Sequence, residues 1–375
     1  MATLVAVGIS FCLYLVISLT VNLEFGYTGI PNFGKVLFVA GGGLIGGSLS
    51  YRLAVYLLGL HSNDILASQY LFSSIINDRM ASDPVFAIGI FAFMVVVAAL
   101  TAGALGFLAS FPAIKLREDY LGMLLLASGE FLNIFFQSYY PITGGSQGLD
   151  VPDPLAGTVA SQGLRDVSVL VVVAFFALGV YLYSERVARS PLGRTLRAVR
   201  DNEVASEALG KDNVAIRRKV LVVASAISGI AGALWVLNAP YILPGQTGTF
   251  TRTVFTFYPF VIVILGGAAN NFGIVVGTLA FTGISQGIAQ ATTYYIKAGN
   301  SLPIDLNRIE PIAIGVLLIL ILMWRPQGLV PEKPTTTIPR GSLDRIVEEV
   351  KASGAGNSEA SGSPGSGVSR ADDEP

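Results

Sequence analysis

Charged residues are scarce in this sequence: Lys, Arg, Asp and Glu together make up 13% of its 375 residues. Hydrophobic residues make up 52%, and the mean hydropathy is +0.63. An average soluble domain carries about 25% charged residues, and so few charges cannot coat a globule of this size in water. The scarcity of charge excludes an ordinary soluble enzyme and indicates a protein that lies in a lipid bilayer.

Cysteine and histidine each occur once, and this removes several kinds of chemistry. Cys12 has no second thiol with which to form an internal disulfide. The sequence has no cluster of metal ligands, so we expect His61 to be a solvated loop residue. The Gly-Lys pairs at 34–35 and 210–211 lack the following Ser or Thr of a nucleotide-binding loop. We therefore expect no enzymatic activity, and no metal or cofactor bound by this chain.

Long uncharged runs mark membrane spans, because a helix needs about 20 apolar residues to cross the hydrocarbon core. The uncharged run 253–296 is twice that length, so we expect it to turn back at 268–271. The run 34–60 contains clustered glycines and Arg52, and we interpret it as a discontinuous helix or a re-entrant element. The hydrophobic segments lie at 3–23, 34–60, 85–111, 119–138, 166–184, 220–238, 254–267, 272–292 and 310–324. The sequence predicts an all-α, polytopic transmembrane helical bundle of roughly 8–10 spans with broken or re-entrant elements.

Basic residues indicate the orientation, because short loops rich in Lys and Arg stay in the cytoplasm. The loop 185–219 holds nine basic residues against five acids. We expect this loop to be cytoplasmic, the loops 139–165 and 239–253 to lie outside, and the chain from Arg325 to be cytoplasmic. The first segment lacks a basic flank and is long enough to span, so we interpret it as a retained anchor in the plasma membrane.

The cytoplasmic loop carries the signals of an amphipathic helix. Ser190 can cap a helix that starts at Pro191, and Gly210 supplies a stop. Between them lie an apolar stripe and a basic stripe, which predict one helix over 191–209 or two short helices joined near 201–202. Such a helix either rests on anionic lipid headgroups or docks on another protein; we favour docking. The run EVASEALG at 203–210 looks like the coupling loop of ABC transporter permeases.

Further motifs resemble one family in order along the chain. The runs LREDYLGMLLLASGE at 116–130 and ITGGSQGL at 142–149 resemble the signature of branched-chain amino acid ABC permeases, in particular the LivM branch. Four further stretches also resemble this family. They are GYTG at 26–29 with NFG at 32–34, SPLGRTLRAVR at 190–200, LGG at 265–267 and RPQGL at 325–329. The resemblance covers residues 20–330. The loop 61–83 departs from the pattern because it is long and polar.

The resemblance implies one subunit of a heteromeric importer of branched-chain or related neutral amino acids. It implies a second permease subunit, homologous or identical, two cytoplasmic ATPase subunits that bind ATP and Mg²⁺, and an extracellular solute-binding protein. We expect the ATPase contact to involve Arg194, Arg197, Arg200, Glu203, Ala205, Glu207, Ala208 and Gly210. Two alternatives remain open: a permease for urea or short amides, and an ion-coupled secondary transporter of small polar solutes.

Polar and glycine residues within or beside the spans are candidates for the solute pathway. Broken helix ends satisfy the ammonium and carboxylate of an amino acid with backbone groups, although glycines serve equally for close helix packing. Glu130 and Asn133 share one face of a helix, where an acid faces either a cavity or a subunit interface. The predicted pathway residues are Asn32, Gly42, Glu130, Asn133, Thr143, Gly144 and Gly145. We expect residues 1–330 to form the permease domain, and residues 331–375 a largely disordered cytoplasmic tail with a possible short amphipathic helix at 342–352.

Overall fold

The computed structural model describes residues 2–62, 64–116, 118–155, 162–297, 309–332 and 345. The chain divides into two units, Met1–Glu332 and Lys333–Pro375, and everything below concerns the first. The helix expected at 342–352 and the Gly- and Ser-rich end at 353–375 lie outside the described residues, apart from residue 345.

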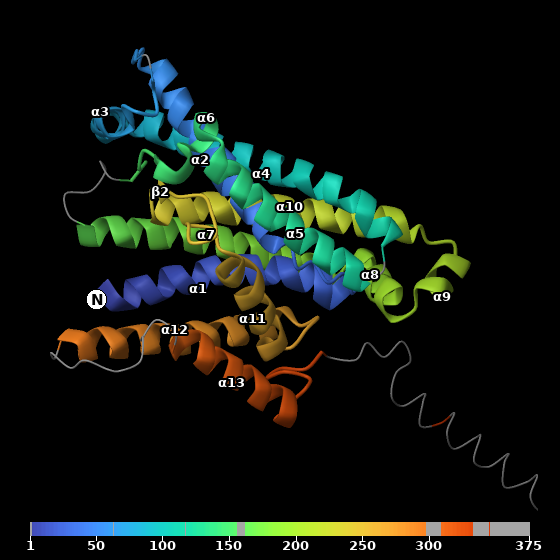
Figure 1. Ribbon diagram of the computed structural model, residues 1–375. Helices are drawn as coiled ribbons and strands as arrows, with labels where there is room; N and C mark the ends of the chain where they lie inside the picture. Colours follow the sequence, from blue (N-terminus) through green and yellow to red (C-terminus); the bar gives the residue numbers. More distant parts are fainter. Residues whose placement is uncertain are drawn as a thin grey trace, which may run out of the picture. The chain divides into compact units, whose positions relative to one another are not determined.

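The first unit is almost entirely helical (Figure 1). Among the described residues, seven helices are long and apolar enough to cross a membrane, and Thr253–Gly266 and Glu310–Trp324 are shorter apolar helices. These nine segments coincide with the nine predicted ones, which confirms a polytopic helical membrane bundle. The elements are α1 (Ala2–Val21), η1 (Asn22–Tyr27), α2 (Lys35–Leu57), α3 (Gln69–Ser82), α4 (Pro84–Lys115), α5 (Glu118–Ser138), α6 (Tyr140–Thr143), η2 (Gly145–Gln147), β1 (Leu149–Asp150), α7 (Gln162–Arg189), α8 (Pro191–Asp201), α9 (Glu203–Ala208), α10 (Asn213–Asn238), β2 (Tyr241–Ile242), η3 (Thr253–Phe257), α11 (Tyr258–Gly266), α12 (Asn271–Lys297) and α13 (Ile309–Trp324).

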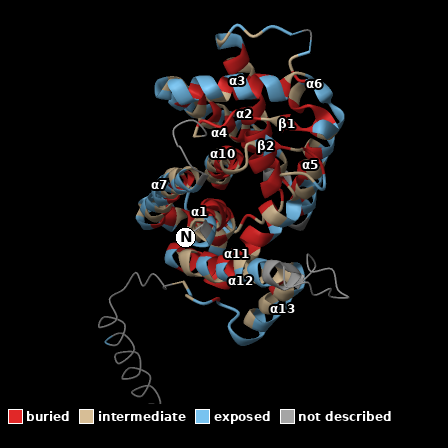
Figure 2. Ribbon diagram, turned by 90° about the vertical axis from the view of Figure 1, so that its left-hand side faces the viewer, coloured by how far each residue is buried: buried red, intermediate tan, exposed pale blue. Residues whose placement is uncertain are grey.

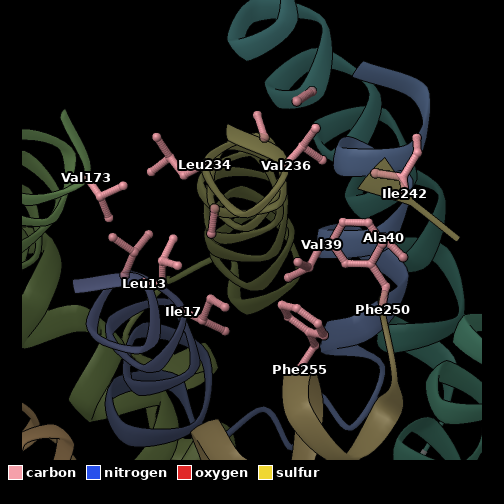
Figure 3. Close-up of a cluster of buried hydrophobic side chains, with 14 of the residues drawn as sticks. Leu13, Ile17, Val39, Ala40, Val173, Leu234, Val236, Ile242, Phe250 and Phe255 are labelled. Carbon is pink, nitrogen blue, oxygen red and sulfur yellow. The ribbon is translucent and has the colours of Figure 1, made fainter. Parts of the chain in front are cut away.

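Helices α1, α2 and α10 form the centre of the bundle (Figure 2). In the most apolar stretch of α2, 78% of the residues are buried, against 28% in α4 and in α7, which present long apolar faces outward. In Figure 3, Leu13 and Ile17 of α1, Val39 and Ala40 of α2, and Leu234 and Val236 of α10 point into one cluster. Phe250 and Phe255 close this cluster from the segment that leads into α11. Their rings are 5.2 Å apart.

Helix α2 corrects one expectation, because it is a continuous α-helix of 23 residues and neither discontinuous nor re-entrant. Its glycines serve close packing. A Cβ on Gly42 would lie 2.5 Å from Cα of Gly229 in α10 and 3.0 Å from the carbonyl oxygen of Ala98 in α4. Helix α2 therefore touches both neighbours along its backbone, which transmembrane helices achieve with small residues.

The two ends of the bundle differ in structure. Helices α8 and α9 lie at one end, and α3, α6 and the β1–β2 pair lie at the other (Figure 1). The strands are antiparallel, with Leu149 opposite Ile242 and Asp150 opposite Tyr241. The segment 61–83, expected to be a loop, contains α3, whose Gln69 donates to the carbonyl of Gly148 and accepts from the N–H of Asp150. The turn expected at 268–271 is confirmed, since α11 ends at Gly266 and α12 begins at Asn271.

Candidate functional site

The segment 190–210 folds as two short helices, as one of the two alternatives predicted. The Ser190 hydroxyl accepts from the N–H of Gly193 at 3.4 Å, and Pro191 occupies the first turn of α8. Asn202 leaves the helical conformation and caps α9 by accepting from the N–H of Ala205 at 2.9 Å. Gly210 has a φ of +76°, a conformation that favours glycine and ends the second helix.

Helix α9 presents nearly all of its side chains to the surroundings. Val204 is 77% exposed and Leu209 is 79% exposed, whereas Ser206 is buried. The Ser206 hydroxyl lies 2.9 Å from Oδ1 of Asn213 at the start of α10, and Asn213 donates to the carbonyl of Glu203. Helix α9 is thus fixed to the start of α10 by hydrogen bonds, while its apolar side chains point away from the bundle. The predicted contact residues Arg194, Ala205, Glu207, Ala208 and Gly210 are exposed as well.

Two arginines of the predicted basic stripe face inward instead. Nε of Arg197 lies 3.0 Å from Oε1 of Glu332, and Arg200 donates to Oε2 of the same carboxylate at 3.0 Å. Arg200 also donates to the carbonyl of Gly26 at 2.6 Å, and the guanidinium of Arg197 lies 5.2 Å from the ring centre of Tyr27. Helix α8 is therefore fastened to the end of the first span, and these two charges are already engaged within the chain.

Residues 327–332, which we call the strap, connect α8 to the turn between α11 and α12. The N–H groups of Leu329 and Val330 donate to the carbonyls of Leu265 and Gly266 at 2.8 and 3.0 Å. Asn270 donates to the carbonyl of Val330 at 3.2 Å. Through Glu332, the strap joins these contacts to the arginines of α8, so a movement of α8 would reach the α11–α12 turn directly.

The same turn is joined to two further spans by asparagine side chains. Asn22 in η1 accepts from the N–H of Ala269 at 2.8 Å and donates to Oδ1 of Asn271 at 3.0 Å. Asn271 in turn donates to Oε2 of Glu185 in α7 at 3.0 Å. Three spans and the strap therefore meet at the α8 end through polar contacts that need defined positions.

A buried ion pair connects the first span to the second. Nζ of Lys35 lies 2.8 Å from Oε2 of Glu24, and Asn32 donates to the same oxygen at 3.1 Å. Glu24 and Lys35 are fully buried. Asn32, a predicted pathway residue, therefore contacts this pair. The only signal for the pair in the sequence is an acid and a base that both border uncharged runs.

Glu130 and Asn133 lie on one edge of α5, beside the chain that leads into α11. Nδ2 of Asn133 donates to the carbonyl of Phe250 at 3.0 Å, and Asn133 is 1% exposed. Glu130 is partly buried. Oε1 of Glu130 and Oδ1 of Asn133 are both buried and accept no hydrogen bond from a described residue. The structure thus brings these two predicted pathway residues together.

Thr143, Gly144 and Gly145 lie beyond the end of α5, in the bend between α6 and η2. The Thr143 hydroxyl donates to the carbonyl of Phe136 at 3.1 Å. Gly144 and Gly145 both have positive φ, +75° and +59°, so the bend depends on glycine at two successive positions. Gly42 lies in the α2–α10 contact described above. The seven predicted pathway residues therefore occupy four separate places.

The described residues contain no group of three or more His, Cys, Asp or Glu side chains placed to hold a metal ion. Cys12 is buried and free. His61 is exposed and hydrogen-bonds the carbonyl of Gly59 at 2.6 Å.

Comparison with known proteins decides the family. The family model "Branched-chain amino acid transport system / permease component" matches residues 3–323. The chain belongs to this family. It is 38% identical over 329 residues to the probable branched-chain amino acid transport permease protein LivM of Methanocaldococcus jannaschii, covering 88% of this chain and 93% of that one. It is 29% identical over 269 residues to the high-affinity branched-chain amino acid transport system permease protein LivM of Escherichia coli, covering 66% of this chain and 59% of that one.

Membership places the chain among multi-pass membrane proteins of branched-chain amino acid transport systems, in agreement with the seven long apolar helices. No solved structure gave a significant match to the chain.

Proposed function

We propose that this chain is the membrane-spanning permease subunit of an ABC importer for branched-chain or related neutral amino acids. Separate ATPase subunits bind ATP and Mg²⁺, an extracellular binding protein delivers the solute, and a second permease subunit completes the pathway. Family membership supports the solute class. The α8 end, with its nine basic residues in 185–219, faces the cytoplasm together with residues 325–332.

The observation that carries the ATPase contact is α9. Val204 and Leu209 are large apolar residues at a polar end of the bundle, and both are more than three-quarters exposed. Exposed apolar tips at such a position are typical of a helix that inserts into a groove on a partner protein. The firm seating of α9 on Asn213 and Arg217 would transmit a push from that partner to α10.

The fully buried acid of the first span argues against ion coupling through Glu24. A secondary transporter needs a titratable group in a span that gains and loses a proton or a sodium ion. Glu24 is fully buried in the first span, but Lys35 and Asn32 already occupy its Oε2 oxygen. An importer powered by separate subunits requires no such group.

The test is co-purification of the permease with ATPase subunits in mild detergent, followed by ATPase assays with the loaded binding protein. We expect stimulation by leucine, isoleucine or valine and none by urea or short amides. Stimulation by urea or amides alone would mean that the solute is urea or a short amide and not an amino acid. If the permease purifies without ATPase subunits and moves solute under an ion gradient, the protein is a secondary transporter and not an ABC importer.

The same co-purification assay tests the α9 surface with substitutions of its exposed apolar residues. Val204→Asp and Leu209→Asp should reduce the recovered ATPase about tenfold or more, as loss of a central apolar contact does. Val85→Asp is the matched control, because Val85 is 80% exposed at the opposite end of the bundle. All three variants should unfold at the wild-type temperature. Full recovery of ATPase with both α9 variants would remove the docking surface from the proposal.

A further inference from the structure

One edge of α5 contacts the segment 245–250 that leads toward η3. Residues 130, 133 and 137 follow one another on this edge, since residues three and four apart are neighbours on a helix. A Cβ on Gly245 would meet the side-chain amide of Gln137 at 2.7 Å. Five residues later the carbonyl of Phe250 accepts from Asn133.

The facing segment continues past Glu130. The Thr256 hydroxyl accepts from the N–H of Val36, and a Cβ on Gly129 would lie 2.6 Å from the Val36 side chain. Thr256 therefore lies near the level of Gly129, as Phe250 lies at the level of Asn133. Glu130 lies between these two levels along α5.

Two buried oxygen atoms on this edge lack a hydrogen-bond donor among the described residues. Oε1 of Glu130 and Oδ1 of Asn133 are buried acceptors without a donor among the described residues, and Asn133 is 99% enclosed. Buried polar atoms are almost always paired, so two unpaired acceptors three residues apart point to a group that binds there. A carboxylate and an amide oxygen together suit a cationic donor with several N–H groups, such as an ammonium.

The facing segment carries a positive residue close to the carbonyl that Asn133 binds. Arg252 follows two residues after the carbonyl that Asn133 holds, is exposed, and forms no ion pair with a described residue. Its guanidinium suits a carboxylate, to which it can donate two parallel hydrogen bonds. Acceptors that suit a cation on α5 and a donor that suits an anion in the facing segment are therefore linked through the Asn133–Phe250 hydrogen bond.

We propose that this edge is a zwitterion subsite of the permease. Glu130 and Asn133 accept hydrogen bonds from the α-ammonium of the amino acid, and Arg252 donates to its carboxylate. The proposal rests on the proposed function, because it names the chemistry by which the permease holds its solute. It also makes the two acceptors and Arg252 a single unit that recognises the part common to all amino acids.

The first experiment uses the full complex in liposomes and measures leucine uptake and ATPase activity together. Glu130→Gln removes the charge but keeps the shape, and should lower uptake about tenfold or more, as loss of a charge-assisted hydrogen bond does. ATPase activity stimulated by the loaded binding protein should stay within about twofold of wild type, because docking precedes release of the solute into the subsite. Glu130→Asp should recover part of the uptake, and Arg252→Gln should show the same split as Glu130→Gln.

Ser128→Ala is the control, since Ser128 lies on the other edge of α5 and donates to its own helix at Leu124. Its uptake should equal that of wild type. Unchanged uptake by Glu130→Gln would overturn the subsite while leaving the importer intact. Loss of both uptake and ATPase by a stably folded Glu130→Gln would also overturn it, because the residue would then serve docking or coupling. If the wild-type complex itself takes up no amino acid, the proposed function is wrong.

The second experiment asks directly whether solute reaches Glu130. In a Cys12→Ser background, Glu130→Cys should react with a water-soluble thiol reagent, and leucine during turnover should slow the reaction severalfold. Phe131→Cys, on the 68% exposed neighbour, should show no protection by leucine. A cysteine at 130 that reacts equally with and without leucine would contradict the subsite.

Discussion

Glu24 and Lys35 show at the scale of single residues how charges persist inside the bundle. Both side chains are fully buried, and Nζ of Lys35 lies 2.8 Å from the Glu24 carboxylate. Breaking such a pair leaves an uncompensated charge in a low dielectric, whereas replacing both charges by neutral groups removes that cost. The pair also has a defined partner in Asn32 and so orients the 28–34 connection between two spans.

Lys35→Met should therefore lower the free energy of unfolding by about 3–5 kcal/mol. The double variant Glu24→Gln with Lys35→Met should recover most of that loss, because no charge is then buried alone. Thermal unfolding in mild detergent measures both. A single variant as stable as wild type, or a double variant worse than the single one, would show that the pair does not carry this energy.

Asp64 gives a pH dependence outside the spans. The N–H of Ala67 donates to its carboxylate, as do the N–H of Leu66 and the hydroxyl of Tyr140, and these bonds hold the pKa of Asp64 below its usual value. Because the pKa of Asp64 is lower in the folded state than its unfolded value of 3.8, the ionised carboxylate stabilises the fold. This stabilisation is complete above pH 3.8 and is lost as the pH falls through the folded pKa. We expect wild type to melt above Asp64→Asn at pH 6, with the difference shrinking toward pH 3. A difference that is constant with pH would contradict this role.

At the scale of elements, α2 depends on glycine where it crosses α4 and α10. A Cβ on Gly42 would lie 2.5 Å from Cα of Gly229, so Gly42→Ala must push two backbones apart. We expect a loss of about 1–3 kcal/mol in the free energy of unfolding, as for other overpacked cores. Gly179→Ala in α7 meets nothing within 4 Å and should be neutral or slightly stabilising, since Ala favours helix over Gly. Equal melting temperatures for the two variants would refute the packing role.

The elements also show what the sequence could and could not predict. The nine apolar segments were predictable, because hydrocarbon thickness sets the length of an uncharged run. The continuity of α2 was not, since clustered glycines signal a helix break and close packing equally. Helix α3 was missed because it is polar on several sides, and its partners in β1 are distant in sequence.

The same limits apply to the candidate site. The caps at Ser190, Asn202 and Gly210 were readable because capping is local. Glu130 and Asn133 were grouped correctly by helical spacing, but the contact of Asn133 with Phe250 could not be predicted without the fold. Arg197 and Arg200 were assigned to the ATPase contact by their spacing, and the structure turns them toward Glu332, more than 130 positions away.

At the scale of the whole molecule, the strap makes the α8 end one mechanical unit. Glu332 binds two arginines of α8, each less than a third exposed, while Leu329 and Val330 bind the α11–α12 turn. Asn22 and Asn271 extend these contacts to the first span and to α7. A displacement of α8 by an ATPase would thus reach three spans through contiguous polar contacts, the kind of path along which coupling energy travels.

Glu332→Gln tests this unit. The amide cannot pair with both guanidiniums, so we expect a loss of about 1.5–3 kcal/mol at the α8–strap contact. The ATPase should still co-purify, because the exposed surface of α9 is unchanged, but the amount of leucine moved per ATP hydrolysed should fall severalfold. Arg79→Gln is the control, since its ion pair with Asp83 is exposed at the opposite end and should contribute little. Normal leucine transport per ATP in Glu332→Gln would mean that α8 reaches the spans through its contacts with η1 and α7 instead of the strap. Loss of the ATPase itself would place Glu332 in docking.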